Sequence, residues 1–162
     1  MNILKSEFYK LKHTWIPWAH FILPVLYALL FYGAATFTGL KNFFDMDIIQ
    51  NFFVLLGAIL PIIFGAITSK VVDMEASAGR FQVILSTTKS RSKAYGGKLI
   101  MLLLSFLFSM SLAVFIFAML FGNQGTMAWL IELLLVFIGC LSTYMIHLWV
   151  SIMLGGGASI GL

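Results

Sequence analysis

Four long apolar stretches follow one another along this chain, separated by more polar segments. They cover residues 15–37, 48–69, 99–121 and 129–154. Each is longer than the roughly 18 residues that indicate a helix able to cross a bilayer. The pattern predicts an all-α integral membrane protein in which residues 1–162 form a single transmembrane domain with four transmembrane helices.

An amphipathic segment, residues 1–14, precedes the first span. Its apolar side chains recur at the spacing of one helical face, and its lysines occupy other faces. The apolar positions are Leu4, Phe8, Leu11 and Trp15, and the lysines are Lys5, Lys10 and Lys12. This spacing predicts an interfacial helix on the inner membrane surface, with its lysines near anionic lipid headgroups. A basic flank that only orients the first span is the alternative.

Small residues inside the spans predict close helix packing. In the second span they recur every four residues together with a proline, at Gly57, Pro61 and Gly65. Such a stripe leaves a groove that another helix can approach. Ser105, Ser109 and Ala113 give the third span a similar face. His20, close to the start of the first span, is expected to be hydrated at the interface, and a polar contact within the helix bundle is the alternative.

The fourth span carries a polar stripe at spacings of three and four residues. Its members are Cys140, Thr143, Tyr144, His147 and Ser151. A histidine deep in a span is a candidate functional group, so Thr143, His147 and Ser151 form a candidate intramembrane polar site. Thr143 and Ser151, one turn away on either side, could instead satisfy His147 within its own helix.

Composition and charge support a membrane protein and fix an expected orientation. Hydrophobic residues make up 61% of the chain and charged residues only 10%, which is too few charges to cover a soluble domain. Nine of the ten Lys and Arg residues lie in segments 1–14 and 70–98, and the tenth is Lys41. Basic residues concentrate on the cytoplasmic side, so both segments and both chain ends are expected there. The net charge of +4 lies outside any basic folded domain and does not indicate a nucleic-acid partner.

The sequence contains no motif that predicts catalysis by this chain. Phosphate-loop, HExxH, CxxC and GxSxG patterns are absent. His13, His20 and His147 are too scattered for a metal site. Glu132 is about 22 Å from His147 along one helix, too far for joint chemistry. We therefore expect no catalytic residue, cofactor or metal.

The longest polar interval, residues 70–98, contains six of the ten basic residues. Asp73 and Glu75 would lie in the first turn of a helix there, where negative charge is favourable. One face of this helix would be apolar, through Met74, Ala78, Phe81 and Leu85. The spacing predicts a cytoplasmic amphipathic helix that binds a soluble partner. A plain loop whose charges only set topology is the alternative.

At these residues the sequence resembles the permease subunits of ABC-2 type transporters. The shared pattern is an acidic residue, a glycine four residues later, an apolar stretch, an arginine, and a lysine that opens the next span. In this chain the pattern falls on Glu75, Gly79, Phe81 to Leu85, Arg91 and Lys98. More narrowly, LKSEFYKLKHTW and EASAGRFQVILSTTKSR are similar to lantibiotic-immunity permeases of Gram-positive bacteria. These small permeases help a producer strain clear its own antimicrobial peptide from the membrane.

The resemblance implies a coupling helix that docks on a separate cytoplasmic ABC ATPase subunit, where ATP is hydrolysed. The implied coupling residues are Glu75, Gly79, Phe81 and Arg91. It further implies a second permease, in a homo- or heterodimer, within the bacterial plasma membrane. Permeases of this family typically have six spans, so the final GGGASIGL is interpreted as the entrance to a fifth span in a C-terminally truncated form. A non-transporting sensor or assembly factor, whose loop binds a partner, is the alternative function.

Overall fold

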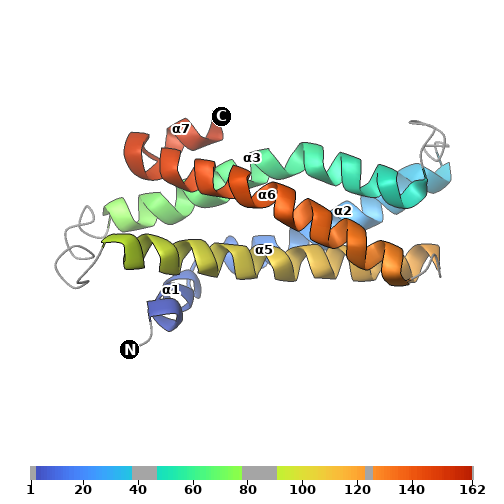
Figure 1. Ribbon diagram of the computed structural model, residues 1–162, viewed down its shortest axis with the longest axis horizontal. Helices are drawn as coiled ribbons and strands as arrows, with labels where there is room; N and C mark the ends of the chain where they lie inside the picture. Colours follow the sequence, from blue (N-terminus) through green and yellow to red (C-terminus); the bar gives the residue numbers. More distant parts are fainter. Residues whose placement is uncertain (1–2, 38–46, 78–90, 123–125, 162) are drawn as a thin grey trace. The chain divides into compact units, whose positions relative to one another are not determined.

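The computed structural model describes residues 3–37, 47–77, 91–122 and 126–161, and all the regular structure within them is helical (Figure 1). The helices are α1 (Ile3–Leu11), α2 (Ile16–Phe37), α3 (Ile48–Ser77), α5 (Arg91–Phe121), α6 (Thr126–Leu154) and α7 (Gly156–Ile160). Four of them, α2, α3, α5 and α6, are long and apolar enough to cross a membrane. This confirms the predicted all-α membrane protein.

Local chemistry explains several of the helix boundaries. The Asp47 carboxylate accepts a hydrogen bond from the Ile48 N–H at 3.0 Å, which satisfies one free donor at the start of α3. Gly122 and Gly155 follow the ends of α5 and α6 with φ of 78° and 92°. Glycine adopts this left-handed conformation without a Cβ penalty, and it is the common way to end a helix.

The end of α3 corrects one sequence-based prediction. Asp73 and Glu75 were expected in the first turn of a separate amphipathic helix, but α3 runs unbroken from Ile48 to Ser77. Both acidic residues therefore lie in its last two turns. The reason is local, because no glycine or proline interrupts residues 66–77 and nothing there removes a backbone hydrogen bond. The rest of the predicted coupling helix, including Gly79 and Phe81, lies outside the described residues.

The described chain divides into two compact units, each built from parts of several helices. Unit 2 contains Trp15–Ile59 and Ser105–Cys140. Its core is aromatic: Phe52 and Phe117 stack with ring centroids 4.2 Å apart, and Phe31 meets both rings edge-on. Stacked and edge-to-face arrangements are the favourable geometries for such rings.

His20 belongs to the interior of unit 2, which corrects its predicted hydrated state. Its side chain is only 8% exposed, and its Nδ1 lies 2.7 Å from the Ser109 hydroxyl. That hydroxyl also donates to the His20 carbonyl at 2.9 Å. The small-residue face of the third span therefore packs against α2, as its sequence predicted. Helix packing overrides the preference of histidine for the interface because the serine offers a hydrogen-bond partner.

Unit 1 contains Met1–Thr14, Leu60–Leu104 and Leu141–Leu162. Phe64 of α3 and Tyr144 of α6 are fully buried in it, with their rings 4.1 Å apart. After Gly155 the chain turns, and α7 packs along α3 (Figure 1). A Cβ placed on Gly65 would lie 2.6 Å from the Ser159 carbonyl oxygen, so this glycine allows the close approach. The groove predicted at Gly65 is confirmed. At Gly57, by contrast, no described atom beyond the adjacent residues and the local helix backbone lies within 4 Å of an added Cβ.

Candidate functional site

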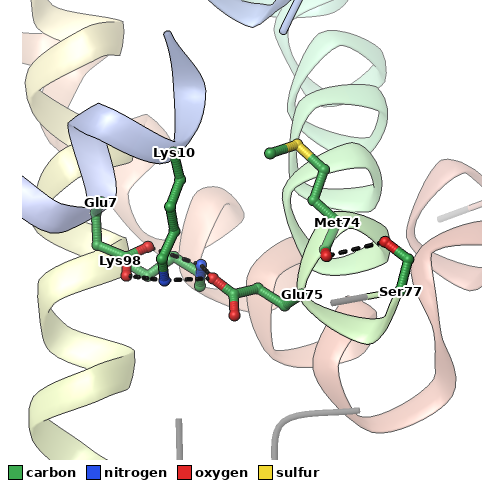
Figure 2. Close-up of polar contacts among 6 residues, drawn as sticks. All are labelled: Glu7, Lys10, Met74, Glu75, Ser77 and Lys98. Carbon is green, nitrogen blue, oxygen red and sulfur yellow. Dashed lines mark hydrogen bonds and ion pairs between the residues drawn. The ribbon is translucent and has the colours of Figure 1, made fainter. Parts of the chain in front are cut away.

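Four charged side chains from three helices of unit 1 meet at one point, as Figure 2 shows. Glu7 and Lys10 come from α1, Glu75 from the end of α3, and Lys98 from the first turns of α5. Lys10 Nζ lies 2.7 Å from a carboxylate oxygen of Glu7 and 2.7 Å from one of Glu75. Lys98 Nζ lies 2.9 Å from Glu7 and 3.0 Å from Glu75. The charges alternate around a closed cycle, which we call the charge ring.

Three of the four residues of the charge ring are buried. Glu7, Glu75 and Lys98 are 7%, 8% and 5% exposed, whereas the side chain of Lys10 is 37% exposed. Two carboxylates and two ammonium groups give the charge ring a net charge of zero. Buried charges are tolerated when they are paired and hydrogen-bonded, and here each charged group contacts two of opposite sign.

Electrostatics favour the charged form of Lys10. Its partial burial lowers the pKa, but the hydrogen bonds and charges of Glu7 and Glu75 more than offset this and raise the pKa above its ordinary value of 10.5. Opposite charges within about 4–6 Å act in this direction. Lys10 therefore remains protonated at neutral pH, as the charge ring requires.

The local sequence places the two α1 members of the charge ring on one face. Glu7 and Lys10 are three residues apart and so project from neighbouring positions of the helix. Leu11, 4% exposed, continues this buried face.

Side-chain hydroxyls satisfy carbonyls at the ends of the two helices. After α1, the Thr14 hydroxyl donates to the Leu11 carbonyl at 2.7 Å. At the end of α3, the Ser77 hydroxyl donates to the Met74 carbonyl at 3.0 Å (Figure 2). Both bonds satisfy carbonyls at helix ends.

A cavity of about 280 Å³ lies beside the charge ring. The charge ring supplies its polar wall, and α1 and α3 supply apolar side chains. It is lined by Glu7, Lys10, Leu11, Val71, Met74, Glu75 and Lys98. The site thus combines paired charges with free space where α1, α3 and α5 come together.

Glu75 is the predicted coupling residue whose side chain the structure describes, and it lies beside other charged groups. Glu75 is a buried member of the charge ring rather than an exposed contact residue. Gly79 and Phe81 lie outside the described residues. Arg91 is the first residue of α5, and only its backbone is described.

Glu7 and Lys98 are also unusual in the sequence, but the sequence did not predict that they pair. Glu7 stands alone among the lysines of segment 1–14, an acidic residue that an anionic membrane surface does not favour. Lys98 is a lysine at the beginning of an apolar stretch, which predicts a partner or a position near the headgroups. Their pairing with Lys10 and Glu75 depends on residues up to 91 positions apart, so no local pattern reveals it.

The candidate intramembrane site forms a second buried polar cluster in unit 1. His147 Nδ1 lies 3.0 Å from the Ser159 hydroxyl and 3.1 Å from its carbonyl oxygen. The Ser151 hydroxyl donates to the Thr68 hydroxyl at 3.3 Å, and that oxygen is 3.0 Å from Ser159. The cluster joins α3, α6 and α7, so His147 finds its partner across helices rather than within α6. Thr143 is partly exposed four residues from His147.

These observations define a helical membrane protein in which charge joins the N-terminal helix to the borders of the central polar interval. The chain belongs to a family described as ABC-2 family transporter protein, whose family model matches residues 3–156. It is therefore a membrane-embedded permease subunit of an ATP-binding cassette transporter. This confirms the family resemblance at the level of ABC-2 permeases. No curated protein and no solved structure matches the chain.

Proposed function

We propose that this permease expels a lantibiotic, or a similar amphipathic antimicrobial peptide, from the bacterial plasma membrane and so protects the cell that makes it. The family supports the transport function, and the similarity of LKSEFYKLKHTW and EASAGRFQVILSTTKSR to lantibiotic-immunity permeases supports the cargo. ATP is hydrolysed on a separate ABC ATPase subunit. The permease works as a pair, with an identical or a related second permease.

The observation that carries the coupling proposal is the position of the charge ring. Glu75 lies two residues before the end of α3, and Lys98 lies seven residues after the start of α5. These helices border residues 78–90, the interval that we assign to ATPase docking. The charge ring therefore lies where a force applied to that interval enters the spans. Glu75 acts in this proposal as a positioning residue that holds the border of the interval in place.

The same contacts support the proposed orientation. Residues 1–14 and 70–98 hold nine of the ten Lys and Arg residues. Glu7 and Lys10 contact Glu75 and Lys98, which supports a position of both segments at the same membrane face. Positively charged segments are retained in the cytoplasm, so we assign this face, with the N-terminus, to the side where the ATPase is.

ATP moves the permease in this mechanism by favouring one of two conformations. A nucleotide shifts such an equilibrium only by as much as it stabilises one state over the other. In this mechanism each permease of the pair docks on an ATPase through residues 78–90. When ATP binding moves the ATPases, the docked interval moves with them, and α3 and α5, which border the interval, move with it. Hydrolysis and release would return the spans to their first state.

A resistance assay with matched variants tests this function. The permease and a partner ABC ATPase are expressed in a lantibiotic-sensitive bacterium, and the lethal peptide concentration and peptide-stimulated ATP hydrolysis are measured. We expect Glu75→Gln with Gly79→Ala to lose stimulated hydrolysis and resistance while the protein remains inserted. Lys70→Gln is the control, because it removes an exposed charge from the same helix.

Three results would contradict the proposal, and each concerns a different part of it. Full resistance in the Glu75 and Gly79 variant would reject the coupling assignment. A wild-type permease that binds its ATPase but confers no resistance to any lantibiotic would reject the cargo. Failure to copurify with an ATPase would instead favour a non-transporting sensor or assembly factor.

A further inference from the structure

We infer that the charge ring is the joint that makes α1 a moving part of the coupling machinery, together with the end of α3 and the start of α5. In this assignment Glu7, Lys10 and Lys98 are positioning residues alongside Glu75. The inference rests on the proposed function for its role in transport, but the joint itself is a property of this chain. It assigns to the N-terminal helix a mechanical role beyond membrane attachment.

The pattern of contacts shows why the charge ring joins three helices. Glu75 accepts both lysines on the same oxygen, Oε1, and Glu7 uses one oxygen for each lysine. Three of the four ion pairs run between helices, and only the Glu7–Lys10 pair lies within α1. A displacement of α3 or α5 therefore separates opposite charges in a largely buried place, where separation is costly.

The charge ring also carries much of the attachment of α1. Among the described side chains of α1, Glu7 and Leu11 are buried. Phe8 and Tyr9 are 41% and 67% exposed, and Lys5 is exposed as well. With so few apolar side chains buried, α1 has little hydrophobic attachment of its own. Its ion pairs to α3 and α5 therefore decide whether it follows them.

The alternating order of charges permits a test in which total charge is held constant. Glu75→Gln with Lys10→Met leaves the Glu7–Lys98 pair, which still connects α1 to α5. Glu75→Gln with Lys98→Met leaves only the Glu7–Lys10 pair, which lies within α1. Each double variant removes one acidic and one basic group, so the two differ in whether a connection between helices remains.

Distance measurement by pulsed electron spin resonance compares these variants in the full-length protein in lipid nanodiscs. The native Cys140 is first replaced by alanine, and spin labels are attached at Lys5→Cys on α1 and Lys93→Cys on α5, both exposed positions of unit 1. We expect one narrow distance in the wild-type background and in the variant that retains Glu7–Lys98. The variant without a connection between helices should show a distribution that is about twofold broader, because α1 opens locally.

The distance distributions show whether the charge ring holds α1 in place. Equal distributions in all three proteins would show that the charge ring does not hold α1, and equal broadening in both double variants would show a general loss of packing. With their ATPase, the same variants should show the same order in peptide-stimulated hydrolysis: the variant that retains Glu7–Lys98 should keep more of it than the variant without a connection between helices. If the distances behave as expected but hydrolysis does not follow them, the joint stands and its role in coupling is overturned. A wild-type permease that confers no resistance would contradict the proposed cargo without changing what the distances say about the charge ring.

Discussion

Each charged side chain of the charge ring contacts two groups of opposite sign, and this arrangement governs what a substitution does. Moving an ion out of water costs several kcal/mol, and paired charges recover this cost only while all partners are present. Lys98 is 5% exposed and contacts both carboxylates. Removing it leaves two buried carboxylates with the partly exposed Lys10 as their remaining partner.

Lys98→Met should therefore destabilise the protein by about 3–5 kcal/mol, the typical cost of breaking a buried ion pair from one side. Adding Glu75→Gln should recover about 0.5–3 kcal/mol of this loss, because coupled neighbours are not additive. Thermal unfolding in detergent, followed by circular dichroism, measures both values. An additive result would mean that Lys98 and Glu75 do not interact.

Lys93→Gln is the control for this cycle. Lys93 is an exposed residue in the first turn of the same helix. Removing an exposed charge typically changes stability by less than about 0.5 kcal/mol. A loss as large as that of Lys98→Met would show that α5 needs its positive charge in general.

At the scale of elements, α7 illustrates how small residues set helix positions. It packs on α3 where Gly65 faces the Ser159 backbone, and Ser159 completes the polar cluster with His147 and Thr68. A Cβ on Gly156 would lie 2.5 Å from the Ser69 hydroxyl. Glycines on both helices thus allow backbones to approach, and hydroxyls then satisfy one another inside the protein.

Gly65→Ala should displace α7 and lower stability by about 1–3 kcal/mol, the typical cost of overpacking. Its Cβ would meet backbone atoms of Ser159 and Ile160 rather than a flexible side chain. Gly57→Ala is the matched control, because open space surrounds that position in the same helix. The control should be neutral or more stable by up to about 1 kcal/mol.

Thermal unfolding of both glycine variants provides the measurement, and proteolysis after Gly155 reports the displacement of α7. Equal effects of the two substitutions would show that the approach of α7 does not depend on Gly65. If Gly65→Ala stabilised the protein, α7 could not pack against Gly65 as described.

At the scale of the whole molecule, the family match covers the segments whose charges predict the orientation. The matched region, residues 3–156, includes α1, both borders of the central interval and all four candidate spans. The charge ring places α1 and these borders together, although up to 91 residues separate its members in sequence. The side of the membrane on which each of these segments lies can be tested in cells without knowing the cargo.

Cysteine labelling in intact cells should show this topology. In a background without Cys140, Lys12→Cys and Lys93→Cys should be protected from a membrane-impermeant maleimide until the cells are opened. Met127→Cys, at the exposed start of α6, should react in intact cells. Labelling of Lys12→Cys and Lys93→Cys on opposite sides would contradict both the topology and the contact between α1 and α5.

The chain order of apolar and charged residues determined the fold class, the four spans and the amphipathic segment before them. These properties follow from transfer free energies of individual residues, which add along a helix and need no knowledge of neighbours. The same reasoning predicted that Gly65 and Ser109 lie on packing faces. The same reasoning placed the end of the second span at residue 69 and a separate helix after it, because the charged residues that follow do not suit a bilayer. The structure continues the helix to Ser77, since no glycine or proline interrupts it.

Only the tertiary structure decided the partners of the buried polar groups. Glu75, expected to contact an ATPase, pairs with Lys10 and Lys98, and His147 finds Ser159 on α7 instead of its helix neighbours. Such pairings depend on which helix faces meet, and the energy of a buried charge or hydroxyl depends on the groups around it rather than on its place in the chain. The sequence thus determined which segments can cross the membrane, and the packing of the helices determined that four charged side chains from α1, α3 and α5 form one charge ring.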